Sequence, residues 1–213
     1  YVVVGTAISM LLTFLGAYAL SRKGWMGKRF ITLMIMFTMY FSGGIIAIYL
    51  WVQQLHMIDT VWAILLPTAL STYNLIVMRT AFANVPESLI EAARLDGASE
   101  FTCLFRIVIP LSQATIAVVL LFYAVARWND WMSATIFLRT ADLYPLQIFL
   151  REILLTSSAD NIISTSGGST NTVALAETIK YATIVISTAP ILCIYPFIQR
   201  YFVTGVMIGG VKE

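Results

Sequence analysis

The chain has 213 residues, of which 59% are hydrophobic and only 11% charged, and its formal net charge at pH 7 is +2. Its mean hydropathy of +0.85 lies far from ordinary globular usage and close to that of membrane proteins. A soluble globular domain is disfavoured, because too little polar surface would remain for solubility. We expect an all-α, polytopic bundle of membrane helices.

Five uncharged blocks are long enough to cross a bilayer, since a spanning helix needs about 20 apolar residues. In chain order they are residues 1–21, 30–58, 60–78, 107–126 and 181–199. All of them contain Gly, Pro, Ser or Thr, which membrane helices tolerate. The chain begins abruptly inside an apolar run, without an initiator Met or a basic signal-type start, so we expect an upstream span.

Basic residues predict the orientation, because Lys and Arg accumulate in short cytoplasmic segments. If the charged segment around residue 91 is cytoplasmic, nine basic residues lie inside: Arg22, Lys23, Lys28, Arg29, Arg79, Arg94, Arg106, Arg200 and Lys212. Four lie outside: Arg127, Arg139, Arg151 and Lys180. This assignment puts residue 1 on the outer side and the C-terminus on the inner side.

The connections between the blocks differ in kind. Residues 21–29 form a tight basic turn with Trp25 suited to the headgroup zone, and residues 53–60 form a short outer turn. That outer turn carries His56, which is either a polar boundary residue or a ligand, although the chain has no second His to complete a metal site. We predict no metal and no disulfide, since Cys103 and Cys193 fall in different parts of the topology.

Residues 127–180 form the one long outer excursion. Its two apolar pieces, WMSATIFL and LYPLQIFL, are too short to span and are predicted to be re-entrant or amphipathic. The polar tract at 156–172 has the composition of a flexible loop.

The charged segment at residues 85–106, which we call the elbow, is predicted to form two helices joined by a turn. Pro86, followed by Glu87 and Glu91 on one face, suits a helix start, and Glu91 can pair with Arg94 three residues on. Ala92 and Ala93 keep the surface low, so another protein could approach closely. Asp96 and Gly97 break the helix, and a second helix starts near Ser99. The pattern alone fits a partner-docking device or a solvated surface equally well.

Two polar groupings could contact a cargo. RWNDW, residues 127–131, offers aromatic faces and polar groups that suit a sugar, but an aromatic belt at a polar helix end explains it as well. The patch that includes Tyr73 and Asn74 lies mid-block, where it could line a cavity or join helices. The cargo candidates are Tyr73, Asn74, Arg127, Trp128, Asn129, Asp130 and Trp131.

EAARLDGAS followed by FRIVIPL resembles the coupling motif of permease subunits of ATP-binding-cassette importers: EAA, then Gly four residues on, then Ile-x-x-Pro. AYALSRKGWMGKR, NVPESLIEAA, RWNDW, YPLQ and the ending QRYFVTGVMIGGVKE extend the resemblance over nearly the whole chain, to the maltose-permease-like carbohydrate-uptake class and its oligosaccharide subgroup. Ala114 departs from it, standing where many members have a second Pro.

The resemblance implies a type I importer transmembrane fold with about six spans, five of them visible here, in a single permease domain over residues 1–213. It also implies a bacterial cytoplasmic membrane location and four kinds of partner: a second homologous permease (a heterodimer), an ATPase dimer, an extracytoplasmic sugar-binding protein and membrane lipid. No nucleic acid is expected. ATP and Mg would be bound by the ATPase, since this chain has no phosphate loop. By position, Glu91 would be the docking carboxylate, Ala92 and Ala93 the contact surface, Gly97 the turn, and Asp96 its cap.

Two other classes of function are considered. An ion-coupled transporter usually places charged residues within its spans, and the five blocks contain none. An enzyme would need clustered catalytic or metal-binding residues, and none are evident. The expected cargo is a sugar, more specifically an oligosaccharide, and Arg127 is hypothesised to favour a uronate-bearing one.

Overall fold

The computed structural model describes the backbone of residues 1–22, 27–164 and 170–209, and side chains over 1–22, 27–156, 178–196 and 199. Every regular element in those backbone ranges is a helix, so the all-α prediction is confirmed. The predicted placement of Trp25 in the headgroup zone concerns a residue outside the described ones, as do the assignments of Lys23 and Lys212.

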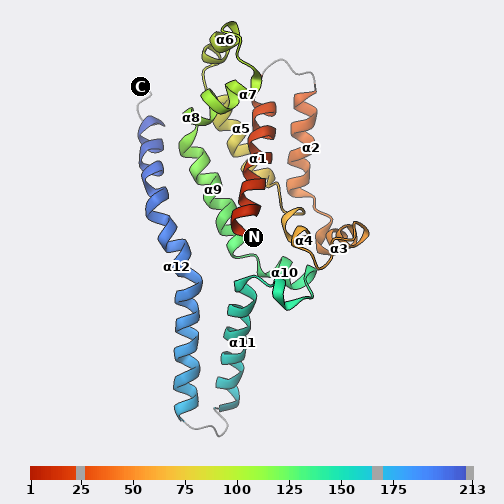
Figure 1. Cartoon of the computed structure of the whole chain (residues 1–213), viewed down its shortest axis with the longest axis vertical. Coiled ribbons are helices and arrows are strands. Elements are labelled where there is room, and N and C mark those ends of the chain that lie inside the picture. Colours follow the sequence, from red (N-terminus) through yellow and green to blue (C-terminus); the bar gives the residue numbers. More distant parts are fainter. Residues whose placement is uncertain (23–26, 165–169, 210–213) are drawn as a thin grey trace.

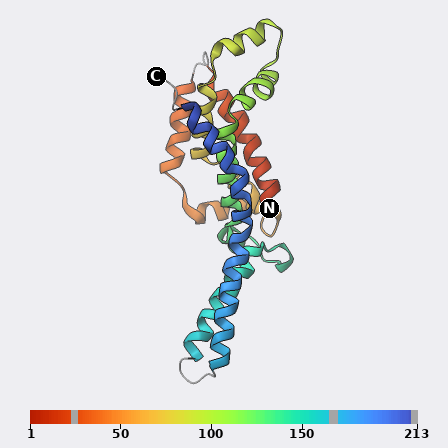
Figure 2. The same ribbon diagram turned by 90° about the vertical axis from the view of Figure 1, so that its left-hand side faces the viewer.

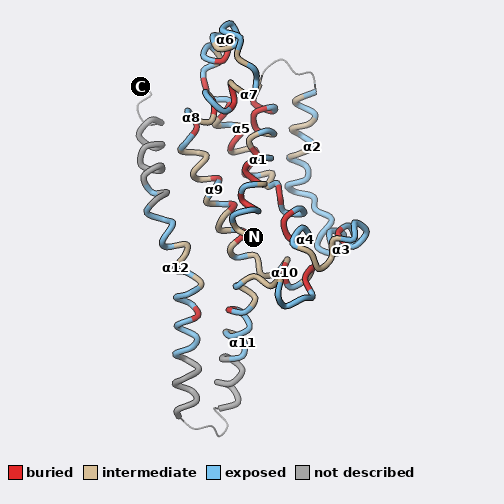
Figure 3. Tube along the Cα trace, in the orientation of Figure 1, coloured by how far each residue is buried: buried red, intermediate tan, exposed pale blue. Residues whose placement is uncertain are grey.

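Three helices form the centre of the bundle: α1 (Val2–Ser21), α5 (Thr72–Ala83) and α9 (Gln113–Trp128). They pack against one another along their length (Figure 1), and the buried residues gather along them (Figure 3). Their shared core includes the fully buried side chains of Ala17, Met78, Phe82 and Val119. Small residues let α1 approach closely, since a Cβ on Gly16 would lie 3.0 Å from Leu75 Cδ1.

The predicted span at 30–58 is not one straight helix. It is α2 (Lys28–Tyr40) followed by α3 (Gly44–Gln54), and the two are bent by 111°. The break falls at Gly43 and Gly44, and Gly44 has φ +73°, a conformation that side-chain-bearing residues resist. Apolar composition alone therefore predicted the right segment but the wrong shape.

The predicted span at 60–78 is also interrupted. It consists of α4 (Val61–Leu65), a non-helical stretch that contains Pro67, and α5. Proline lacks the N–H that a continuing helix would need, so the carbonyls at the end of α4 must find other donors.

The elbow lies at one end of the bundle. It comprises α6 (Glu87–Leu95), α7 (Glu100–Cys103) and the π-helical turn η1 (Leu104–Val108), and α8 (Ile109–Leu111) follows. The segment Glu100–Leu111 then bends by 89° into α9, so the predicted span at 107–126 is not one straight helix either. The bend occurs although Ala114 replaces the second Pro. Figure 1 shows α6 at the far tip of the molecule, beyond the ends of α1 and α2.

The opposite end is formed by α10 (Trp131–Phe137), the 3-10 turn η2 (Ala141–Leu143), and a hairpin of α11 (Leu146–Ser164) and α12 (Thr170–Gly209). Figures 1 and 2 both show the hairpin projecting from the bundle on the side away from the elbow. The prediction of a flexible loop over 156–172 is wrong for most of that tract, because α11 and α12 continue through it. Residues 165–169 lie outside the described ones.

Among the described residues, two helices are long and apolar enough to cross a membrane, Val2–Ser21 and Thr178–Pro196. The number rises to four if each of the two bent pairs is one span. The first and last predicted spans are thus confirmed as single helices.

Packing at the centre of the bundle gives the first testable prediction. Phe82 is 0% exposed, so Phe82→Ala should leave a cavity between α1 and α5 and destabilise the fold by about 3–5 kcal/mol. Phe82→Leu keeps more of the volume and should cost less. Thermal inactivation of the purified protein in detergent measures both, and equal inactivation temperatures for the two variants would contradict the packing argument.

Candidate functional site

The first helix of the elbow, α6, packs one face against the bundle and exposes the other. Glu87 in its first turn and Arg94 in its last turn suit the helix dipole. Ile90 is 1% exposed, and Ala93 packs against the same core cluster. Glu91 and Ala92 lie on the exposed side. Of the two predicted contact alanines, only Ala92 is therefore fully exposed.

The turn after α6 matches the prediction. Gly97 has φ +80°, and the N–H of Ala98 reaches back to the carbonyl of Ala93 at 2.9 Å, which closes the end of the helix. Ser99 then caps α7, with its Oγ accepting from the Thr102 N–H at 3.3 Å. Asp96 takes part through its backbone N–H, which donates to the Ala92 carbonyl at 3.1 Å.

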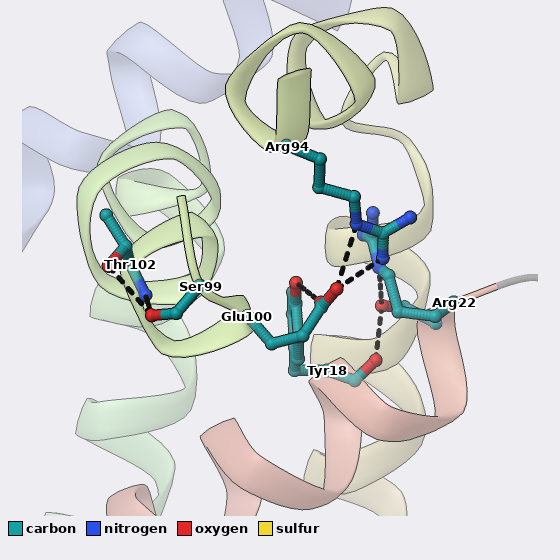
Figure 4. Close-up of polar contacts among 7 residues, drawn as sticks. Tyr18, Arg22, Arg94, Ser99, Glu100 and Thr102 are labelled. Carbon is teal, nitrogen blue, oxygen red and sulfur yellow. Dashed lines mark hydrogen bonds and ion pairs between the residues drawn. The ribbon is translucent and has the colours of Figure 1, made fainter. Parts of the chain in front are cut away.

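The carboxylate of Glu100 connects the elbow to the bundle (Figure 4). Glu100 Oε2 accepts a hydrogen bond from the Tyr18 hydroxyl of α1 at 2.6 Å. Its Oε1 accepts from Arg94 Nε at 2.8 Å, and Arg94 Nη2 lies 2.6 Å away. The predicted pairing of Arg94 with Glu91 is therefore wrong, because the turn at Gly97 brings Glu100 to Arg94 instead.

Arg22 completes this network at the end of α1. Its guanidinium lies 5.0 Å from the centroid of the Tyr18 ring, and Nη2 donates to the Phe82 carbonyl at 3.0 Å. Hydrogen bonds from Tyr18 and Arg94 lower the pKa of Glu100, against the opposing effect of its partial burial. Glu100 is consequently a charged acceptor at neutral pH.

The exposed face of the elbow offers a surface for another protein. No hydrogen bond or ion pair engages Glu91 within the described part of the chain. Leu95 is 90% exposed and Phe101 66%, so the elbow presents apolar side chains as well as charged ones. The sequence analysis missed Leu95 and Glu100; an apolar residue at the end of a charged amphipathic helix was the available signal for Leu95.

A second feature is a polar cavity of about 550 Å³, where the interruption between α4 and α5 meets the end of α9. Its polar lining residues are Thr68, Ser71, Asn74, Tyr123, Arg127, Asn129, Asp130 and Ser133. Ser71 caps α5, and the Tyr123 hydroxyl accepts from the Ser71 N–H at 3.1 Å and contacts Thr13 Oγ1 at 2.8 Å. Hydrogen bonds through Tyr123 thus connect the cavity-lining residues of α9 to the start of α5 and to α1 behind the wall.

Arg127 is 7% exposed, and its guanidinium supplies the donors that the end of α4 lacks. Nη1 donates to the carbonyl of Ile64 at 3.0 Å, and Nη2 donates to the carbonyls of Leu65 at 3.1 Å and Thr68 at 2.9 Å. Further bonds reach Thr68 Oγ1 at 2.5 Å and Ser9 Oγ of α1 at 3.4 Å. Arg127 therefore stabilises an interrupted helix, and its N–H groups point at the backbone.

Of the other predicted cargo residues, three line the cavity and three do not. Asn74, Asn129 and Asp130 line the cavity, and Asp130 Oδ1 also caps α10 by accepting from the Ser133 N–H at 3.1 Å. Trp128 Nε1 donates to the Ser187 carbonyl of α12 at 2.9 Å, and the Arg151 guanidinium lies 3.5 Å from the Trp131 ring centroid.

The remaining aromatic candidate, Tyr73, is 54% exposed and faces Phe122. Neither tryptophan of RWNDW is among the residues that line the cavity, and Tyr73 is not one of them either.

These features define a class of protein: a multi-pass membrane subunit with interrupted spans, an open polar cavity and an exposed helical elbow at one end. The chain belongs to the family described as binding-protein-dependent transport system inner membrane component, whose model matches residues 8–208. It is therefore a transport permease of the cytoplasmic membrane.

Similar proteins are transport components as well. The chain is 43% identical over 210 residues to the polygalacturonan/rhamnogalacturonan transport system permease protein YtcP of Bacillus subtilis, covering 99% of this chain and 73% of that protein. It is 41% identical to Protein LplC of the same organism, covering 99% and 70%. A crystal structure of a bacterial ABC transporter involved in import of the acidic polysaccharide alginate superposes with a TM-score of 0.82 at 33% identity, covering 95% of this chain and 71% of that one.

The turn of the elbow can be tested at Gly97. Gly97→Val forces a β-branched residue to φ +80° and should displace α6 and lower transport strongly, by roughly tenfold if the turn costs more than about 1.4 kcal/mol. Gly97→Asn is the matched control, because Asn tolerates this conformation better. Transport assays of the reconstituted complex compare them, and full transport by the Val variant would show that the turn does not need Gly.

Arg127 provides a second test. Arg127→Gln removes donors from the buried carbonyls of Ile64 and Leu65 and the part-buried carbonyl of Thr68, at a cost of about 1–3 kcal/mol for a buried group left unsatisfied. Ile64 keeps a second donor, the Thr68 hydroxyl. We expect lower stability and an equal loss of uptake for acidic and neutral oligosaccharides, measured with the binding protein saturated. Arg139→Gln, an exposed arginine at the same end, is the control. A selective loss of acidic cargo would instead support the hypothesis that Arg127 contacts a uronate.

Proposed function

We propose that this chain is one of two homologous permease subunits of an ATP-driven oligosaccharide importer, and that its elbow docks on a cytoplasmic ATPase. The observation that carries the proposal is the exposed tip of α6, which presents Glu91 and the 90% exposed Leu95 at the far end of the molecule. A carboxylate beside an apolar side chain suits a groove that combines a basic group with an apolar floor.

The distribution of basic residues supports a cytoplasmic elbow. Arg22 directly follows α1, and Lys28 and Arg29 begin α2, at the end of the bundle where the elbow lies. Cytoplasmic segments are rich in such residues. The hairpin of α11 and α12 then projects to the outer side, where a sugar-binding protein would deliver the cargo.

We assign the cargo by the chemistry of the polar cavity and by similarity. Amides, hydroxyls and one carboxylate suit the hydroxyl groups of a sugar, while the Arg127 guanidinium already binds backbone carbonyls. Among the similar proteins whose names give a substrate, YtcP is named for polygalacturonan/rhamnogalacturonan and the solved transporter for alginate, while relatives of 25–29% identity are named for arabinooligosaccharides, lactose or galactooligosaccharides. An oligosaccharide from such a polysaccharide is the proposed cargo.

The partners follow from the surfaces that this chain leaves uncovered. No residue of α2 is buried within the chain, and large apolar side chains of α2 and α3 such as Phe37, Ile46 and Trp51 are 56%, 73% and 65% exposed. A second permease or lipid would cover this surface. We assign ATP and Mg to the ATPase partner and none to this chain.

The docking role can be tested by charge reversal. Glu91→Lys should weaken binding of the ATPase and uncouple ATP hydrolysis from transport by at least tenfold, since repulsion would replace attraction. Glu91 lies on the exposed side of α6, so the permease itself should still fold. Co-purification of the ATPase with the permease and uptake into proteoliposomes measure the two effects.

The control for this test is Glu152→Lys, the same change at an exposed residue of α11, far from the elbow. It should retain the ATPase. If Glu91→Lys binds the ATPase and transports normally, the elbow is not the docking site, and a solvated surface becomes the better interpretation of its charges.

A further inference from the structure

We infer that Glu100 is the joint through which movement of the elbow is passed to α1, and from α1 to the polar cavity. The inference rests on the proposed docking of the elbow on an ATPase. Glu100 is thereby a positioning residue, distinct from the exposed Glu91 that would contact the partner.

The hydrogen bonds of Glu100 run in two different directions. The two oxygens of the Glu100 carboxylate face two different helices, with Oε2 bonded to Tyr18 of α1 and Oε1 to Arg94 of α6 (Figure 4). The ion pair with Arg94 is about half exposed and adds little by itself. The 2.6 Å bond from the Tyr18 hydroxyl is different, because it is charge-assisted and its donor is a residue only 8% exposed.

The elbow is also attached to the bundle through apolar contacts. Ile90 and Cys103 insert into the core cluster, where contacts are non-directional and allow one helix to slide over another. The Tyr18 bond, by contrast, loses its energy when its distance or angle changes. A tilt of α6 that moves Glu100 therefore pulls on Tyr18, whose ring also lies against Arg22.

The path from Tyr18 to the cavity is a single helix. On α1, Thr13 Oγ1 lies 2.8 Å from the Tyr123 hydroxyl and Ser9 Oγ lies 3.4 Å from Arg127 Nη2, and both partners line the cavity. Ser9 and Tyr18 are separated by nine residues of α1, or about 14 Å of helix. A shift of α1 thus acts on the cavity wall through two buried hydrogen bonds.

The test uses the complete transporter, reconstituted with its ATPase, second permease and binding protein. Three variants are compared with the unchanged protein: Tyr18→Phe, Glu100→Ala and the double variant. We measure ATPase retention, ATP hydrolysis with the loaded binding protein, and cargo moved per ATP. We expect the ATPase to remain bound and cargo per ATP to fall about three- to tenfold in each single variant, with no further fall in the double variant.

Two controls isolate the joint. Tyr49→Phe removes a hydroxyl from α3 and should leave cargo per ATP unchanged, and Glu100→Gln keeps an acceptor for Tyr18 and should recover part of the loss. A general loss of stability would lower hydrolysis and transport together and leave their ratio as it was. The ratio is therefore the readout that a merely structural role would not change.

Other outcomes would contradict the inferred role of Glu100. Unchanged cargo per ATP in Tyr18→Phe would do so, as would losses in the single variants that add in the double variant. Detachment of the ATPase from Tyr18→Phe would show that Glu100 serves docking and not transmission. If Glu91→Lys also binds the ATPase and transports normally, the docking proposal itself is wrong. If Glu91→Lys has its expected effect but Tyr18→Phe and Glu100→Ala leave cargo per ATP unchanged, only the role of Glu100 is wrong.

Discussion

The structure depends on one constraint, which is that every backbone carbonyl within a bilayer needs a donor inside the protein. The chain interrupts its apolar segment after α4, where the carbonyls of Leu65 and Thr68 would be left without partners and that of Ile64 would keep only the Thr68 hydroxyl. Arg127 supplies the donors. This guanidinium belongs to α9 and also reaches Ser9 of α1. The hydrogen bonds of Arg127 therefore hold α1, α9 and the interruption after α4 in fixed positions relative to one another. The polar cavity lies where they meet.

A similar arrangement occurs at the elbow with the opposite charge. There a carboxylate, Glu100, binds donors from two helices, and Arg22 attaches the same corner to the end of α5 through the Phe82 carbonyl. Each of these polar clusters joins segments that are distant in sequence, and each includes α1. Apolar packing gives the bundle its cohesion, whereas these charged groups determine which helix ends are held together.

The sequence predicted elements that depend on local chemistry. The first and last spans, the turn at Gly97 and the start of α7 near Ser99 follow from composition, backbone freedom and capping, and all are present. Hydropathy reports burial but not straightness, so it missed the bends after Tyr40 and Leu65, although Gly44 and Pro67 marked them. Spacing rules consider partners three or four residues away, so they paired Arg94 with Glu91 and overlooked Glu100 beyond the turn. The role of Arg127 was not predictable, because its acceptors lie about 60 residues earlier and become accessible only when the helix is interrupted.

The last helix has a consequence for the size of the molecule outside the membrane. At about 1.5 Å per residue, the 40 residues of α12 extend about 60 Å, twice the thickness of a hydrocarbon core. Thr178–Pro196, the part of α12 whose side chains the structure describes without a gap, has the composition of a span. Eight helical residues precede it, beginning at Thr170, and they extend the helix by roughly 12 Å before that stretch. A soluble molecule that diffuses towards this face of the membrane consequently meets the hairpin before it can reach the bundle, and the height of the hairpin limits how closely a rigid, flat partner can approach.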